Sequence, residues 1–222
     1  MNVIYRLKNI FFVSTVFIAI SLSSPIGFSK EILLSDACTT NCRTPYGETL
    51  GVGSGNVAAF SNCSSDCVVF SPNKSNGTYT GIKWQCVEYA RRWLLVNKGV
   101  VYGDVDVAAD IWGLDFVTRI KDKAELKMSS YPNGNEKLPE VGDLLIYAKA
   151  YLNTGHVAVI SSVDTKTRTI QVVEQNYYNT KWKNDYARSI SYVEHDKKIW
   201  LLDAYLLGWK RVTNQPVKTA KK

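Results

Sequence analysis

The chain has 222 residues, with 27 lysines and arginines against 20 aspartates and glutamates and a formal net charge of +7. This length is sufficient for one domain with a buried core. The cations are scattered along the chain apart from Lys218, Lys221 and Lys222. This distribution does not favour a nucleic-acid-binding surface, so we expect no nucleic-acid partner.

Residues 1–29 have the pattern of a secretory signal peptide. Arg6 and Lys8 precede an apolar run over 10–22 that is too short to span a bilayer comfortably, and small residues precede Lys30. We therefore expect cleavage before Lys30 and a secreted or periplasmic protein without an integral membrane span. An uncleaved anchor is the alternative. Without the two signal cations the mature charge is 27 − 2 − 20 = +5.

Residues 30–80 contain four of the five cysteines and are rich in Gly, Ser, Asn and Thr, which predicts a loop segment over 30–76 with a flexible run at 51–55. In an exported chain the four cysteines are expected to form two disulfides. Three pairings are possible, one of which would link two antiparallel segments, and a zinc site is the competing interpretation. The candidates are Cys38, Cys42, Cys63 and Cys67, and the linking pattern is Cys38–Cys67 with Cys42–Cys63.

A helix is predicted to follow Gly81 and to carry the fifth cysteine. Neither Gly nor Pro occurs between Trp84 and Val96, and apolar residues recur at spacings of three and four, which predicts a largely buried helix that Gly99 ends. Cys86 lies in the first turn, where the helix dipole and free N–H groups favour a thiolate. Since the other four cysteines can pair among themselves, Cys86 is either a buried core residue or a nucleophile.

After this helix the hydrophobic period changes. We expect a second helix over 108–117, capped by Asp104 or Asp106, and a loop over 129–139. Helices followed by antiparallel strands predict an α+β fold. The strands are expected at 143–147, 156–163, 169–175, 189–193 and 205–212.

The sequence contains two histidines, His156 and His195. His195 lies in a charged stretch that is typical of a solvated turn, whereas His156 opens an apolar strand. If the turn between this strand and the next is centred at Thr165, His156 faces Glu174 across an antiparallel pair, within reach of a hydrogen bond. An ordinary cross-strand polar pair is the alternative, and a one-residue change of register would turn Glu174 to the other face.

Cys86, His156 and Glu174 combine a thiol, a base and a group that can orient the base, which favours nucleophilic catalysis. Asn176 would share the face of Glu174 and could take the same role. The backbone N–H of Cys86 and the side chain of Gln85 are candidates to stabilise an oxyanion. This chemistry requires no metal or organic cofactor, and two distant histidines offer no cluster of zinc ligands.

Four blocks of the sequence carry a resemblance to a known family. They are Trp84-Gln85-Cys86-Val87-Glu88, Gly155-His156-Val157-Ala158, Glu174-Gln175-Asn176 and Leu207-Gly208-Trp209. In this order they resemble the CHAP family, the cysteine- and histidine-dependent amidohydrolases and peptidases. Within that family the likeness is to the amidase domains of glutathionylspermidine synthetase/amidase and trypanothione synthetase.

The resemblance implies a papain-like fold of the NlpC/P60–CHAP type, with N-terminal helices packed on a C-terminal antiparallel sheet. By position it implies Cys86 as the nucleophile, His156 as the base and Glu174 as its orienting partner, with Asn176 as a further position of the site. It also implies that Arg91 could meet a substrate carboxylate.

We therefore expect a signal peptide, a disulfide-linked segment over 30–80, a CHAP catalytic core over 81–213 and a basic tail over 214–222. The signal peptide and the four-cysteine segment depart from the family pattern. The expected function is a monomeric, secreted thiol amidase or peptidase that acts on a peptidoglycan stem peptide or on a glutathione–polyamine conjugate. A non-catalytic module of the same fold, which binds cell wall or a partner protein, is the alternative.

Overall fold

The described part of the chain folds into one α-helix and a large antiparallel sheet. The computed structural model describes residues 34–217, so the predicted signal peptide and residues 218–222 of the tail lie outside the described residues. The helix is α1 (Cys86–Lys98). The strands of the large sheet are β5 (Val100–Val101), β6 (Phe116–Arg119), β7 (Glu125–Pro132), β8 (Leu144–Tyr147), β9 (Val157–Asp164), β10 (Thr169–Val173), β11 (Arg188–His195), β12 (Lys198–Leu201) and β13 (Leu206–Pro216).

These nine strands are ordered β12-β11-β10-β9-β8-β13-β7-β6-β5, and neighbours run antiparallel. The five strands expected from the sequence are confirmed, with β13 extending to Pro216. The sheet is larger than predicted because β5, β6, β7 and β12 join it. The expected loop over 129–139 is wrong at its start, since β7 continues to Pro132 and pairs with β13.

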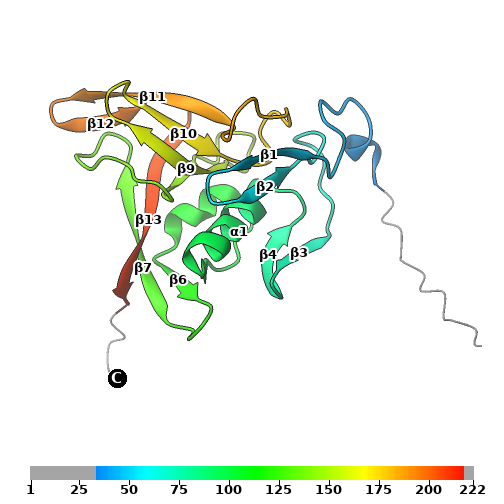
Figure 1. Ribbon diagram of the computed structural model, residues 1–222, viewed down its shortest axis with the longest axis horizontal. Coiled ribbons are helices and arrows are strands. Elements are labelled where there is room, and N and C mark those ends of the chain that lie inside the picture. The colour runs from blue at the N-terminus through cyan, green and yellow to red at the C-terminus, as the bar shows by residue number, and fades with distance from the viewer. Residues whose placement is uncertain (1–33, 218–222) are drawn as a thin grey trace, which may run out of the picture. The chain divides into compact units, whose positions relative to one another are not determined.

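The predicted helix is confirmed. Gly99 ends α1 in the left-handed conformation, with φ 65°. Figure 1 shows α1 next to β9, with β3 and β4 on another side. Its apolar residues pack against alternate residues of the sheet, including Leu144 and Ile146 of β8 and Val157 and Val159 of β9. No helix within residues 34–217 has both the length and the apolar character to cross a membrane.

The other face of the sheet has its own core. Leu145, Ala158 and Ile160 point into it, as the two-residue period of a strand requires, and they meet Trp209 and residues of β11 and β12. An isolated bridge joins Asn135 to Ile199, so the β12 edge curls back towards the loop after β7. Both faces are therefore buried in the centre of the sheet.

The expectation of N-terminal helices in the plural is corrected. The stretch expected as a second helix is a short 3-10 helix, η2 (Ala108–Gly113), followed directly by β6. Gly113 and the β-branched Val117 favour an early end of the helix and an extended backbone after it. Another 3-10 helix, η1 (Asp36–Cys38), precedes the strands. The described fold is mostly antiparallel sheet with one α-helix packed on it.

The segment expected as a loop contains two hairpins, β1 (Thr49–Gly53) with β2 (Val57–Phe60) and β3 (Pro72–Ser75) with β4 (Thr78–Ile82). Its glycines serve close packing. A Cβ on Gly51 would lie 2.4 Å from Cε3 of Trp182, and one on Gly53 would lie 2.2 Å from Cγ1 of Val173. The glycine-rich composition therefore reflects contact with the rest of the domain and gave a wrong prediction of a loop.

Two disulfides join residues 38–42 to residues 63–67. The pairs are Cys38–Cys67 and Cys42–Cys63, which is the pattern expected to link two segments. Sulfurs engaged in disulfides are not available as thiolate ligands, so the alternative zinc site is excluded in this structure. Cys38 and Cys67 also form a small buried cluster with Val69.

Candidate active site

Neighbouring strands bring four chemically active side chains to one end of the sheet. Tyr147 ends β8, His156 immediately precedes β9, Glu174 immediately follows β10, and Arg188 begins β11. Antiparallel neighbours alternate in direction, so the end of one strand lies beside the start of the next. Residues far apart in sequence therefore meet at this edge.

The predicted register between β9 and β10 is wrong by three residues next to the turn and by two residues beyond a bulge near Gln171. Val172 pairs with Ile160 rather than with Ala158, because the turn is longer than expected and the bulge reverses one residue of the shift. A shift of two residues leaves each side chain on its original face. Glu174 therefore still reaches His156, and its Oε2 lies 2.8 Å from Nε2 of the ring.

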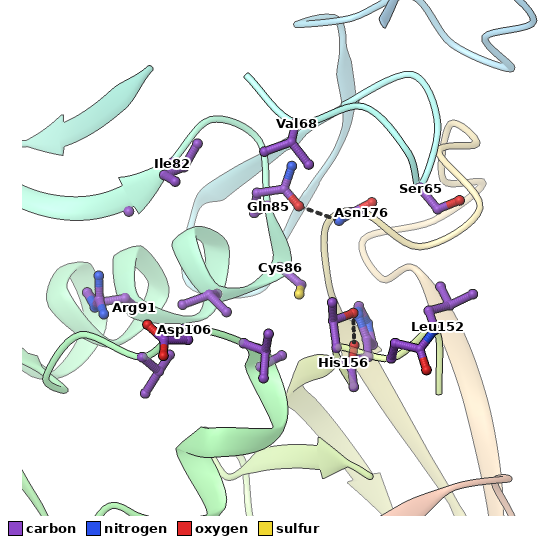
Figure 2. Close-up of a pocket in the computed structure, with 18 of the residues that line it drawn as sticks. Ser65, Val68, Ile82, Gln85, Cys86, Arg91, Asp106, Leu152, His156 and Asn176 are labelled. Carbon is purple, nitrogen blue, oxygen red and sulfur yellow. Dashed lines mark hydrogen bonds between the residues drawn. The ribbon is translucent and has the colours of Figure 1, made fainter. Parts of the chain in front are cut away.

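The thiol of Cys86 lies in the same pocket as His156. Cys86 is the first residue of α1, is 7% exposed, and is the free cysteine beside four that form disulfides. Figure 2 shows its sulfur on the side of the pocket where His156 lies. Since Nε2 of His156 is bonded to Glu174, Nδ1 is the ring nitrogen left for the thiol.

The pKa of His156 reflects both neighbours. Burial lowers it, but the hydrogen bonds and charges of Cys86 and Glu174 outweigh burial and raise it from 6.5 to about 9. The pKa of Glu174 is lowered: burial raises it, and the cations Arg188 and His156 more than reverse this. An imidazolium beside an ionised carboxylate is therefore favoured at neutral pH.

A buried polar cluster fixes α1 against the sheet. Glu88 of α1 accepts hydrogen bonds from Arg92 Nε, at 2.7 Å, and from Gln175 Nε2, at 3.1 Å. Gln175 also donates to the backbone oxygen of Gln85, at 3.2 Å. Because Gln175 directly follows Glu174, this cluster ties the start of α1 to the strand end that carries the carboxylate.

Gln85 and Asn176 lie together at the mouth of the pocket. Asn176 Nδ2 donates to Gln85 Oε1 at 2.7 Å (Figure 2), and Gln85 Nε2 donates to the backbone oxygen of Cys67 at 3.0 Å. Asn176 is thus bonded to Gln85, while Glu174 is the carboxylate bonded to His156. The N–H of Cys86, at the first position of α1, has no acceptor within the helix and stands next to this amide.

Arg91 lines the pocket, but its guanidinium has partners within the protein. It donates to the backbone oxygens of Thr80, at 3.2 Å, and Gly103, at 2.8 Å, and pairs with Asp104 at 3.1 Å. Figure 2 shows it apart from His156, beside Asp106. The predicted role in binding a substrate carboxylate would require a ligand to compete with Asp104.

The sequence reasoning missed the groups behind Glu174. Arg188 Nε lies 2.7 Å from Glu174 Oε1, and the same guanidinium contacts Asp203 and Tyr147. The sequence did contain one signal for Arg188. This residue directly precedes the strand expected at 189–193, which is the next expected strand after the one that contains Glu174. By contrast, the side chain of His195 is 79% exposed, as its charged surroundings predicted.

The pocket is a groove of about 780 Å³ with three walls around the thiol. The first wall comes from the disulfide-linked segment, the second from residues 104–108 and the third from residues 151–155. Asp66, Val68 and Phe70 belong to the first wall, and Asp104 and Asp106 belong to the second. Within residues 34–217 no group of three His, Cys, Asp or Glu side chains is placed to hold a metal ion.

Comparison with known proteins gives a consistent result. The family model described as CHAP domain matches residues 74–176. The bifunctional glutathionylspermidine synthetase/amidase of Escherichia coli (strain K12) is 33% identical over 187 residues, which are 77% of this chain and 30% of that protein. The trypanothione synthetase of Crithidia fasciculata is 34% identical over 161 residues, which are 72% of this chain and 24% of that protein.

The glutathionylspermidine synthase of Crithidia fasciculata is 30% identical over 192 residues, which are 76% of this chain and 26% of that protein. The chain thus spans less than a third of the length of these three relatives. The described fold, an antiparallel sheet with a helix that begins at Cys86, is consistent with the papain-like architecture.

Proposed function

The chain carries a CHAP domain over residues 74–176, and from this premise we propose that it is a secreted cysteine amidohydrolase whose nucleophile is Cys86. The family match and the relative named as an amidase support a hydrolase that acts on amide bonds. One observation carries the choice of residues. The free thiol of Cys86 opens into the same groove as His156, whose Nε2 is bonded to Glu174 at 2.8 Å.

In the proposed reaction the proton of Cys86 already resides on Nδ1 of His156, and the thiolate sulfur attacks the amide carbonyl carbon. The N–H of Cys86 and the amide of Gln85 stabilise the oxyanion that forms. His156 then gives the proton to the leaving nitrogen as the C–N bond breaks and a thioester remains. Water loses a proton to His156 and attacks the thioester, and the C–S bond breaks to release the acid and to restore the thiolate beside the imidazolium.

Glu174 keeps the ring of His156 in place throughout this sequence. Its carboxylate accepts a hydrogen bond from the N–H at Nε2 and stabilises the imidazolium. The carboxylate is 1% exposed, so little water competes for this hydrogen bond. Asn176 supports Gln85 rather than His156 in this mechanism.

The groove favours a substrate with a cationic part. Asp66, Asp104 and Asp106 line it, and the nearby cation, Arg91, is already paired with Asp104. A glutathione–polyamine conjugate has such a part, and a peptidoglycan stem peptide is the second candidate substrate. Exposed Val68 and Phe70 on the disulfide-linked wall would contact the aliphatic portion of either molecule.

The test is to incubate the protein with purified peptidoglycan and, separately, with a glutathione–polyamine conjugate, and to identify the products by mass spectrometry. We expect cleavage of an amide bond in one of them. Cys86→Ala should reduce turnover on the order of 10⁴-fold or more while the circular dichroism spectrum stays unchanged. His195→Ala is the matched control and should keep full activity, since that side chain is 79% exposed. Turnover retained by Cys86→Ala would contradict the proposal.

A further inference from the structure

Arg188 forms the back of the candidate site. Its Nε donates to Glu174 Oε1 at 2.7 Å, its Nη1 to Asp203 Oδ2 at 2.6 Å and its Nη2 to Tyr147 Oη at 2.7 Å. Tyr147 Oη in turn donates to Asp203 Oδ2 at 2.7 Å. The guanidinium is thus held in one orientation by partners on three different segments of the chain.

The two oxygens of Glu174 have different nearest partners. Oε1 accepts from Arg188 Nε at 2.7 Å, whereas Oε2 accepts from His156 at 2.8 Å and also from Arg188 Nη2 at 3.5 Å, so the carboxylate can rotate only by giving up one of these bonds. Glu174 is also almost completely buried. A buried carboxylate without a cation would tend to take up a proton, and a protonated carboxyl no longer stabilises an imidazolium.

We propose that Arg188, oriented by Asp203 and Tyr147, is a positioning residue that keeps Glu174 ionised and directed at Nε2 of His156. This inference rests on the proposed function, because its purpose is to sustain the thiolate–imidazolium pair of Cys86 and His156. Arg188 and Asp203 lie beyond residues 74–176, which match the CHAP domain.

The groups that surround Glu174 and Arg188 support this positioning role of the arginine. Glu174 meets His156 and Arg188 as its cationic neighbours, and the ring of Tyr177 lies 4.3 Å from Cζ of Arg188. Burial raises the pKa of both Tyr147 and Tyr177, so their phenols stay neutral over the working range of pH. The charges that act on Glu174 are therefore those of the arginine and the histidine, and on Arg188 those of Glu174 and Asp203.

The experiment compares Arg188→Met, Arg188→Lys and a control, Arg211→Met. Arg211 holds a buried carboxylate in a similar way, with Nη2 2.7 Å from Asp143 Oδ2. Asp143, however, directly precedes β8, at the end of that strand opposite to Tyr147. Loss of either arginine should lower stability, whereas only Arg188 faces Glu174. Thermal unfolding measures the first effect, and the site is measured by two readouts that need no substrate.

The first readout is the rate at which iodoacetamide alkylates Cys86 as a function of pH. The reactive species is the thiolate paired with the imidazolium. When Glu174 takes up a proton at low pH this pair is lost, and the alkylation rate falls along the acid limb of the pH profile. Arg188 lowers the pKa of Glu174, so we expect Arg188→Met to move this acid limb to higher pH. Arg188→Lys keeps the charge and should restore much of the limb. Arg211→Met should leave it where it is in the wild type.

The second readout is the NMR titration of the two histidines, with His195 as an internal reference. In Arg188→Met the signal of His156 should broaden or report more than one ring environment, because Glu174 is released on one side. Where a substrate is cleaved, kcat should fall about 100-fold with little change in KM, the size expected for misplacement of a catalytic group. Arg188→Lys should recover part of kcat.

A wild-type acid limb, together with a wild-type spectrum for His156 in folded Arg188→Met, would overturn the proposal. So would an equal shift in Arg211→Met, which would indicate general loss of stability. The failure of the proposed function has a different signature. In that case no amide is hydrolysed by the wild type, while the alkylation and NMR profiles of the variants still report whether Arg188 positions Glu174.

Discussion

At the residue scale, the site depends on which partner each of the two ring nitrogens of His156 contacts. Nε2 of His156 is bonded to Glu174, and the ring lies beside the thiol of Cys86 in a pocket where the imidazole is 2% exposed. Burial alone would keep the imidazole neutral. The two neighbours reverse this and raise the pKa of His156 to about 9, so the cation persists at neutral pH.

Glu174→Gln should therefore lower the pKa of His156 below about 9, because both the hydrogen bond and the negative charge of Glu174 raise it. The imidazolium would then lose its proton at a lower pH, and the alkaline limb of kcat/KM should move downwards. We expect kcat to fall on the order of 10²- to 10⁴-fold. NMR titration of the two histidines measures the pKa, and an unchanged titration of His156 would contradict this mechanism.

At the element scale, the segment with the disulfides does more than close the N-terminal part of the described chain. Its residues Asp66, Val68 and Phe70 line one wall of the groove. The backbone oxygen of Cys67 accepts from Gln85 Nε2 at 3.0 Å and from Asn62 Nδ2 at 3.2 Å. The wall is therefore connected to the residue that precedes Cys86.

The two disulfides allow a matched comparison. They close loops of similar length, with sequence separations of 29 and 21, so removal of either should cost about 3 kcal/mol of stability. The pair Cys38→Ala/Cys67→Ala releases the backbone that holds Gln85, whereas Cys42→Ala/Cys63→Ala does not. We expect kcat to fall further in the first double variant than in the second.

Denaturant unfolding and steady-state kinetics of both double variants measure these effects below their unfolding midpoints. Equal stability losses with a larger kcat loss for Cys38→Ala/Cys67→Ala would support a role of this wall in the site. Equal kinetics in the two double variants would show that the contact between Cys67 and Gln85 has no effect on turnover.

At the scale of the whole molecule, the disulfides and the predicted signal peptide point to the same compartment. Disulfides persist where the environment is oxidising, and both pairs are formed in the structure. We expect the exported protein to begin at Lys30 and to have Cys86 as its one titratable thiol.

Intact mass spectrometry of the protein recovered from the host's exported fraction tests this prediction. Alkylation before reduction should add one label, and alkylation after reduction and unfolding should add five, one for each cysteine. A Cys86→Ala variant should lack the single label and serves as the control. A chain that retains residues 1–29, or that takes up several labels without reduction, would argue against export and disulfide formation.

Local patterns determined the elements that carry the candidate site. The apolar spacing after Trp84 predicted the helix that begins at Cys86, and the alternation around His156 and Glu174 predicted two adjacent strands. The hydrophobic period depends on near neighbours in the chain, so it can be read without a structure. Even the wrong register kept Glu174 on the correct face, because beyond the bulge near Gln171 it was wrong by two residues.

The sequence by itself thus determined which residues could react and which elements carry them. The tertiary structure alone decided what surrounds them. Strand order brings Arg188 to Glu174 and Asp203, Gln175 meets the buried Glu88 of a helix predicted as apolar, and Trp182 packs where a Cβ on residue 51 would stand. These contacts join positions far apart in the chain, and no local pattern encodes which distant side chain fills a given space or neutralises a given charge.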